Sequence, residues 1–373
     1  MVPETRTNLV VSAVTKDNLM VDFSLKAAAI DADQLAARGQ AMAALGLPIR
    51  LELHTFGARD IDAPDTFERA CANVARFRSD HPASTLVVHV PLQSVKLVTS
   101  RDFDSDQCLR SIEFADRIGA SSIVLHRYWG LVFGEGAPRV ADKRAAEAAF
   151  NEVVRDLAQA AAGKRLLVEN VGHYSLLPRD GKNYLSGPLD HFFPWEIARF
   201  RDFARAEGLT NVEPFVDVAH ATLSANLFNR KRAAYDATRG DPRFAWISDE
   251  DLDASDWLES FDFVDADMPY LHVSDAVRLD RAQVTAPHLD EDDLTRSIVS
   301  EGLELGTGSL PFADLPDHFG DRGTIVLEVD PAPGEGHVDN GAQRRSLERL
   351  RAIYAARTAG QCGGTAIGLP QSL

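Results

Sequence analysis

The segment FVDVAH, residues 215–220, decides the fold, because a short apolar run ends there in Asp217 and, three residues later, His220. Six other apolar runs have a residue at or just after their C-terminal end that can bind a metal or move a proton. They are LELH (51–54), LVVHV (86–90), IVLH (123–126), LLVEN (166–170), YLHVSD (270–275) and IVLEVD (325–330). The carboxyl ends of parallel strands form the active face of a barrel. The series therefore predicts a site at one rim of such a barrel.

Segments with helical periodicity or helix-forming composition alternate with these runs. They cover residues 25–44, 66–79, 106–118, 141–162, 195–207 and 343–356, and Gly46, Gly119, Gly163 and Gly208 follow four of them as left-handed C-caps do. Counting residues 8–14 as the first strand and 323–330 as the last gives eight strands. The pattern predicts an α/β protein with a closed (β/α)8 TIM barrel. An open doubly wound sheet is the alternative, although no glycine-rich nucleotide fingerprint follows the first strand.

The chain of 373 residues is predicted to form one barrel domain over residues 1–358. Two connections, about 173–194 and 221–268, are longer than barrel loops need to be and extend the loops after strands 5 and 6. Each is expected to be either a lid over the site or an insertion that contacts another subunit. Residues 359–373 are expected to form a tail that is flexible or packed on a neighbouring subunit.

The net charge of −17 disfavours partners that are polyanions, such as nucleic acid or anionic lipid. Cys71, Cys108 and Cys362 are widely separated and lack the spacing of a disulfide framework or a zinc module. No apolar run approaches the roughly 18 residues of a membrane-spanning helix. We predict a cytoplasmic protein without a membrane or nucleic-acid partner.

Four successive strand ends carry carboxylates or an imidazole, namely Glu169, Asp217, His272 and Glu328. Such groups are costly within apolar strands unless they are paired, bound to a metal or exposed at the strand end. Carboxylate oxygen together with imidazole nitrogen is a donor set that divalent cations accept. These four residues are therefore the candidate metal ligands.

The order VENV, DVAH, LHVSD, GTG and LEVD, which spans most of the chain from LELH to LEVDP, resembles the xylose-isomerase-like TIM barrels. This superfamily includes ketose 3-epimerases, hexose isomerases, inosose dehydratases and zinc-dependent apurinic-site endonucleases. The resemblance implies that Glu169, Asp217, His272 and Glu328 hold one Mn²⁺, Mg²⁺, Co²⁺ or Zn²⁺. It also implies that Glu169 and Glu328 exchange the substrate proton, and that the protein forms a dimer or tetramer.

The expected function is therefore that of a metal-dependent isomerase or epimerase of a sugar, polyol or related polyhydroxylated carbonyl compound. Two carboxylates on opposite faces of the substrate can remove and return a proton by way of a metal-stabilised enediolate. A metal-dependent lyase or dehydratase uses the same proton removal and is the first alternative. An apurinic-site endonuclease and a metal-free binding barrel are the other two.

Four further residues have open roles at the predicted rim. His220 either binds the substrate oxygen that becomes negative, which makes it the third catalytic candidate, or orients Asp217 or ligates a second ion. His89 and His126 either bind substrate hydroxyls, which we favour, or form a second metal site with Glu169. Glu52 either contacts substrate or makes a buried ion pair with an arginine at the barrel floor.

The endonuclease branch carries an Asp-x-His pair before its glycine loop, whereas this chain reads EGLEL at 301–305 and then GTG at 306–308. A third metal at His220 therefore has no obvious ligands. Arg278 is a candidate for binding a substrate carboxylate or phosphate, and Lys96, Arg127 and Asp275 also fall in loops at the predicted mouth. The GTG segment is interpreted as a tight turn, because a short Gly-x-Gly is a weak signal for phosphate binding.

Overall fold

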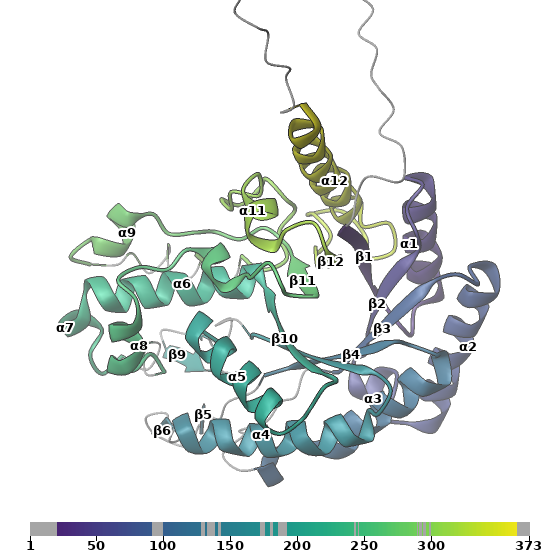
Figure 1. Ribbon diagram of the computed structural model, residues 1–373, viewed down its shortest axis with the longest axis horizontal. Helices are drawn as coiled ribbons and strands as arrows, with labels where there is room; N and C mark the ends of the chain where they lie inside the picture. The colour runs from purple at the N-terminus through teal and green to yellow at the C-terminus, as the bar shows by residue number, and fades with distance from the viewer. Residues whose placement is uncertain are drawn as a thin grey trace, which may run out of the picture.

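The computed structural model describes residues 21–363, apart from 92–99, 128–130, 133–138, 141–142, 172–175, 180–181, 186–191, 242–243, 245, 289, 291–292, 294–295 and 298–299. The described chain forms a closed barrel of eight parallel strands in the order β1-β12-β11-β10-β7-β4-β3-β2. These strands are β1 (Val21–Ala28), β2 (Arg50–His54), β3 (Thr85–His89), β4 (Ser122–His126), β7 (Arg165–Glu169), β10 (Val212–Asp217), β11 (Tyr270–Val273) and β12 (Gly323–Leu327). The predicted (β/α)8 barrel is confirmed (Figure 1).

The first strand differs from the prediction. Residues 8–14 lie outside the described residues, and β1 instead contains residues that were predicted to begin a helix at Leu25. The run Leu25-Lys26-Ala27-Ala28 consists of good helix formers. It is nevertheless a strand, because β1 pairs in parallel with β12 on one side and with β2 on the other, and this pairing overrides the local preference. The helix begins only at Ala32, where the carboxylate of Asp31 caps it.

Long helices cover the outside of the barrel. They are α1 (Ala32–Ala44), α2 (Pro64–Asp80), α3 (Ser105–Ile118), α4 (Lys143–Ala160), α5 (Pro194–Ala206), α6 (Val218–Ala233) and α12 (Gly341–Gly363). The four predicted C-cap glycines, Gly46, Gly119, Gly163 and Gly208, all have positive φ angles between 66° and 86°. Glycine adopts this left-handed conformation without a steric cost, so these positions end the helices sharply. Because α12 continues to Gly363, the predicted tail begins within a helix, and residues 364–373 lie outside the described part.

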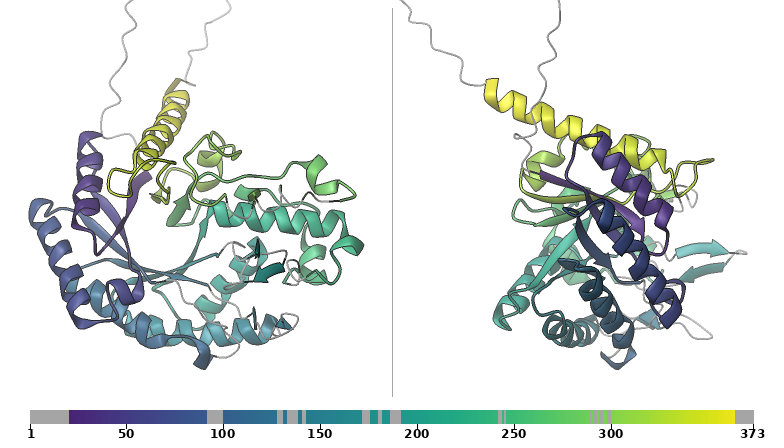
Figure 2. Two further views of the ribbon diagram at one scale, coloured as in Figure 1. Left: turned by 180° about the vertical axis from the view of Figure 1, so that it is seen from behind. Right: turned by 90° about the vertical axis from the view of Figure 1, so that its right-hand side faces the viewer.

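The two long connections contain regular structure of their own. Within the connection after β7, β8 (Leu176–Arg179) and β9 (Lys182–Leu185) form an antiparallel hairpin. The connection after β10 holds most of α6, followed by α7 (Tyr235–Thr238), α8 (Asp249–Ala254) and the 3₁₀ turn η4 (Ser260–Phe263). Figures 1 and 2 show α6 running away from the barrel strands toward α7 and α8. The short elements α9 (Arg281–Thr285) and α11 (Leu315–Phe319) lie between β11 and β12, and α9 packs against α6.

The remaining short elements are the 3₁₀ turns η1 (Gly57–Arg59) and η2 (Ser100–Asp102) and the strand pair β5 (Leu131–Val132) and β6 (Arg139–Val140). Among the described residues, no helix is both long enough and apolar enough to span a membrane.

One layer of side chains fills the barrel interior directly beneath the rim. It consists of Val87, Val124, Leu167, Phe215, Tyr270 and Val326, all of them buried. Because side chains of a strand alternate between its two faces, the residue two positions later points to the same interior at the next level. Those residues are His89, His126, Glu169, Asp217, His272 and Glu328. The apolar layer thus forms the floor on which the predicted site residues stand.

Candidate metal centre

Strand pairing places the site residues at one level of the barrel. His54 is paired in register with His89, His126 with Glu169, and Asp217 with His272. Glu328 follows β12 directly, and its backbone N–H donates to the carbonyl oxygen of Val273 on β11. Parallel strands in register end at the same rim, so residues far apart in the sequence become neighbours.

The four predicted ligands converge. One donor atom from each of Glu169, Asp217, His272 and Glu328 lies within 4.8 Å of the others. His272 Nδ1 is 3.1 Å from Glu169 Oε1 and 2.7 Å from Glu328 Oε2. All but Glu328 are almost completely buried, and the side chain of Glu328 is 15% exposed. The centre is therefore enclosed in protein and reachable from one side.

The donor set fits a divalent cation. Glu328 Oε2 is buried and accepts no hydrogen bond from any residue in the described part of the chain. A buried carboxylate oxygen without a hydrogen bond is costly unless a cation compensates its charge. Three carboxylates and one imidazole are the ligand types that Mn²⁺, Co²⁺ and Zn²⁺ accept. Which ion binds is not decided by this donor set.

The charges of the centre also favour a cation. Burial opposes the ionisation of Glu169 and Glu328, but the imidazole of His272 outweighs it and holds the pKa of both carboxyls well below the usual range. Burial lowers the pKa of His272, and the surrounding glutamates more than reverse this. Burial raises the pKa of Asp217, and His220 only partly opposes the rise because Glu328 and Glu169 repel the charge. A bound cation would relieve that repulsion.

Glu52 lies one level below the rim, in register with Val87 of the floor layer. Its carboxylate is fully buried and has three partners: His272 Nε2 at 2.9 Å, His54 Nε2 at 2.9 Å and the hydroxyl of Tyr270, which donates over 2.7 Å. No arginine is among these partners, so the predicted ion pair at the barrel floor is not formed. The carboxylate instead bonds to the nitrogen of His272 that faces away from Glu169 and Glu328.

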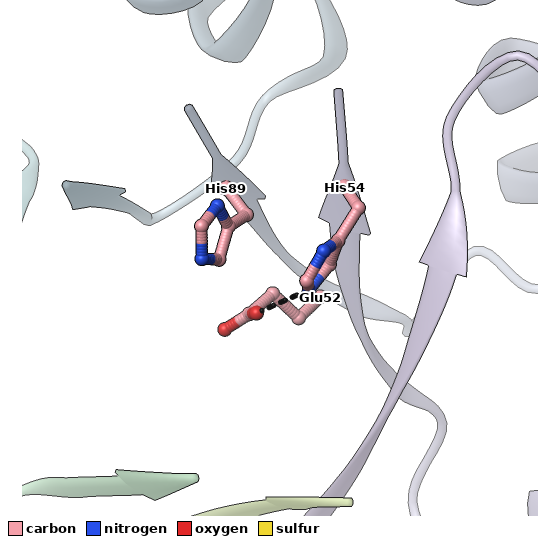
Figure 3. Close-up of side chains that lie close together, drawn as sticks. All are labelled: Glu52, His54 and His89. Atoms are coloured by element: carbon pink, nitrogen blue, oxygen red, sulfur yellow. Dashed lines mark hydrogen bonds and ion pairs between the residues drawn. The ribbon is translucent and has the colours of Figure 1, made fainter. Parts of the chain in front are cut away.

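Glu52, His54 and His89 form a second group with metal-ligand spacing. Figure 3 shows the three side chains gathered at the ends of β2 and β3, with a dashed line between Glu52 and His54. The rings of His54 and His89 are stacked, with centroids 4.3 Å apart. His54 also lies 3.6 Å from Glu328, which joins this group to the four candidate ligands.

Glu169 connects the four candidate ligands to the two other histidines. Its Oε1 atom faces His272, while its Oε2 atom is 3.2 Å from His89 Nε2 and 3.3 Å from His126 Nε2. The structure thus brings together the trio predicted for a second metal or for substrate hydroxyls. A third group with ligand spacing combines His89 and Glu169 with His272 rather than with His126.

His220 is held in the first turn of α6. Its backbone N–H donates to the carboxylate of Asp217, which caps the helix, and its Nδ1 atom is 2.8 Å from the carbonyl oxygen of Asn170. His220 Nδ1 lies 3.5 Å from Glu169 Oε1, and His220 Nε2 lies 3.3 Å from Glu301 Oε1. Glu301 therefore stands opposite His220, in the segment where the Asp-x-His pair is missing from the sequence.

Other residues predicted at the mouth lie elsewhere. Arg278 pairs with Glu259 at 2.7 Å and lines a separate cavity beside α6. Arg127 is buried, with its guanidinium 4.2 Å from the ring centroid of Phe192. Lys96 lies outside the described residues.

The GTG segment wraps around a carboxylate of the protein itself. The backbone N–H groups of Gly306 and Gly308 donate to Asp275 Oδ2, and that of Leu310 donates to Asp275 Oδ1. A Cβ atom on Gly308 would lie 2.4 Å from the carbonyl oxygen of Ala276. The anion in this turn is Asp275, so the interpretation as a turn agrees with these contacts.

Sequence reasoning missed Tyr270, Asn170 and Lys26. Tyr270 could have been found, because it lies two residues before His272 and therefore on the same face of its strand. Asn170 bonds through its side chain to the backbone N–H and C=O of Asp217 and so joins two strand ends. Lys26 Nζ, 3.6 Å from Glu328 Oε1, was hidden by the helical interpretation of residues 25–28.

Comparison with solved structures identifies the fold. A D-allulose 3-epimerase from Methylomonas sp. superposes with a TM-score of 0.50 at 14% identity, over 90% of this chain and 98% of its own. This chain has the xylose isomerase-like barrel fold. A xylose isomerase domain protein from Alicyclobacillus acidocaldarius subsp. acidocaldarius (TM-score 0.47, 17% identity, 90% of this chain and 99% of its own) is also similar. So is endonuclease IV from Thermus thermophilus (0.45, 16%, 90% and 99%).

No family model matches the sequence, and no curated protein matches it at a significant level. At the identities of the matched structures, the likeness to xylose isomerase-like barrels establishes the fold and leaves the reaction to be argued from the site.

Proposed function

We propose that this protein is a divalent-metal-dependent isomerase or epimerase that acts on a sugar, polyol or related polyhydroxylated carbonyl compound. The observation that carries the proposal is the convergence of Glu169, Asp217, His272 and Glu328 at one end of the barrel. These four residues would hold the ion. A divalent ion that binds a carbonyl oxygen and the adjacent hydroxyl makes the C–H bond between them more acidic.

The two glutamates would move the proton. One carboxylate oxygen takes the proton from carbon, and the electron pair of the broken C–H bond forms a carbon–carbon double bond while the carbonyl oxygen becomes negative. The other carboxylate returns a proton, to the opposite face in an epimerisation. His220, buried beside Glu169, would donate a hydrogen bond to the oxygen that becomes negative.

Glu52 and Tyr270 would support this chemistry without touching substrate. A histidine that binds a metal through one nitrogen commonly donates its other N–H to a carboxylate, which fixes the ring orientation. Glu52 is placed to accept from His272 Nε2 while Nδ1 faces Glu169 and Glu328. Its complete burial argues for this positioning role over the substrate contact expected from the sequence.

The endonuclease alternative is less favoured. Glu301 is the residue opposite His220, in a segment that lacks the Asp-x-His pair of that branch, and the chain carries a net charge of −17. A surface with this charge repels the DNA backbone.

Solvent-exchange measurements test the proposal. The metal-loaded protein, incubated in D2O with a panel of ketoses, aldoses and inositols, should introduce deuterium at one carbon of its substrate. Glu169→Gln and Glu328→Gln should each slow this exchange by about 100-fold or more, since general acid–base catalysis contributes on that scale. Glu250→Gln, on the exposed surface of α8, is the matched control and should exchange at the wild-type rate.

Full exchange in either active-site variant would eliminate the two-carboxylate mechanism. Exchange accompanied by loss of water or of another β-substituent would assign the protein to the lyase alternative. The absence of exchange with every compound of the panel would count against the whole proposal.

A further inference from the structure

A cavity of about 410 Å³ opens beside the candidate metal centre, at the ends of β1 and β2. Lys26 and His54 line it, and each of them also lies 3.6 Å from Glu328 Oε1. A molecule bound at the centre over Glu328 would therefore reach this cavity directly. Its volume is within the range of about 300–1,000 Å³ of small-molecule sites.

The cavity has more positive charge than its own carboxylates neutralise. Lys26, Arg38 and Arg59 line it together with Asp31 and Asp330. Asp330 pairs with Lys26 at 3.0 Å, and Asp31 accepts the backbone N–H groups at the start of α1. Both carboxylates thus have partners within the protein, and neither forms an ion pair with an arginine in the described part of the chain.

The two arginines keep their charge available. Arg38 is buried and donates to the carbonyl oxygens of Lys26, His337 and Val338, which are neutral acceptors. Burial lowers its pKa to about 10, as expected where no carboxylate contacts the guanidinium.

Arg59 is exposed and lies over the ring of Phe56, with 4.7 Å from its guanidinium carbon to the ring centroid. No carboxylate among the described residues forms an ion pair with it. The neighbouring Asp60 is buried and accepts the N–H of Phe56 instead. In a chain of net charge −17, a cavity wall with two guanidinium groups that no carboxylate contacts is a local exception.

We propose that the substrate of the metal centre carries a carboxylate or phosphate group, and that this group binds in the cavity against Arg59. Guanidinium groups bind both anions through paired N–H donors. Phe56, which is 44% exposed at the same wall, covers the apolar face of the ligand. The inference rests on the proposed function for the position of the reacting carbon, whereas binding of the anion can be measured without turnover.

Calorimetric titration of the metal-loaded protein with glycerol 3-phosphate, glycerate and glycerol tests the proposal, because the three probes differ in their anionic group. At least one anion should bind about 10-fold or more tightly than glycerol, and the better anion identifies phosphate or carboxylate. Arg59→Gln should weaken its binding by about 10- to 100-fold, as expected for charge-assisted hydrogen bonds, and leave glycerol binding unchanged. Arg59→Lys, which keeps the charge and loses the paired donors, should fall between the two.

Arg144→Gln removes an exposed arginine that pairs with Glu250 on the outer surface, and it should bind all three probes as the wild type does. Equal binding of the three probes by the wild type would overturn the proposal. So would an anion preference that survives in Arg59→Gln, because the anion would then bind the metal alone. If the preference depends on Arg59 but no deuterium exchange is found with any substrate, the proposed reaction fails and the anion site stands.

Discussion

At the scale of single residues, Glu52 shows how one position in a strand determines a role. It occupies the floor layer, where the neighbouring strands place apolar side chains such as Val87. A carboxylate at this level is stable only with strong partners, and it has them in His272, His54 and Tyr270. The proximity of Glu52 raises the pKa of Tyr270 further above its usual value than burial alone does, so the phenol stays a donor.

Removal of the Tyr270 hydroxyl tests whether this network positions His272. Tyr270→Phe should weaken metal binding by about 10-fold, because loss of a group that orients a metal ligand typically costs 10- to 100-fold in affinity. Competition with a chromogenic chelator for Co²⁺ or Zn²⁺ measures the affinity directly. Tyr235→Phe, an exposed tyrosine bonded to Asp249, is the control. Equal affinities of both variants and the wild type would remove the positioning role.

At the scale of elements, a charged cluster joins three helices on the outer side of the barrel. Lys143 at the start of α4 contacts Glu196 of α5 at 2.6 Å and Asp251 of α8 at 2.8 Å. Glu196 is fully buried, and the indole N–H of Trp195 donates to Asp251. The cluster fixes α8, which belongs to the long connection after β10, against the barrel helices.

Lys143→Met should therefore lower the free energy of unfolding by about 3 kcal/mol, since it leaves two buried carboxylates without their cation. Urea unfolding followed by circular dichroism measures the change. The adjacent Arg144→Met breaks an exposed pair with Glu250 and should cost at most about 1 kcal/mol. A similar loss in both variants would show that burial of the cluster contributes nothing special.

The helix α6 explains why part of the connection after β10 was interpreted as an irregular insertion. Every residue from Val218 to Arg230 is buried, because η4, α7 and α9 surround the helix. A helix covered on all sides has no polar face and therefore no amphipathic period that a sequence pattern could reveal.

At the scale of the whole molecule, the metal centre links distant strands, so an ion bound there should stabilise the entire barrel. Mass action predicts a gain of about 2.7 kcal/mol in the free energy of unfolding at an ion concentration 100 times the dissociation constant. Thermal unfolding with and without Mn²⁺, Co²⁺ or Zn²⁺ measures this gain.

Asp217→Asn should lose most of that gain, because it removes a charged ligand while an asparagine still caps α6. Glu250→Gln should keep it. An undiminished gain in Asp217→Asn would mean that the ion binds at another group, such as Glu52, His54 and His89.

Much of the architecture follows from the sequence by itself. Continuous apolar runs separated by helical segments and left-handed glycines predict an eight-stranded parallel barrel, because each of these patterns is local in the chain. The positions of Glu169, Asp217, His272 and Glu328 at successive strand ends predict that they meet, because all strands of such a barrel end at one rim.

The tertiary structure alone decided which groups touch. The first strand is Val21–Ala28 because pairing on both sides outweighs the helical preference of its residues. The contacts of Glu52 with Tyr270, of Glu301 with His220 and of Lys26 with Glu328 join residues whose separation in the chain carries no pattern. Barrel closure brings such residues together, and closure depends on the packing of all eight strands at once.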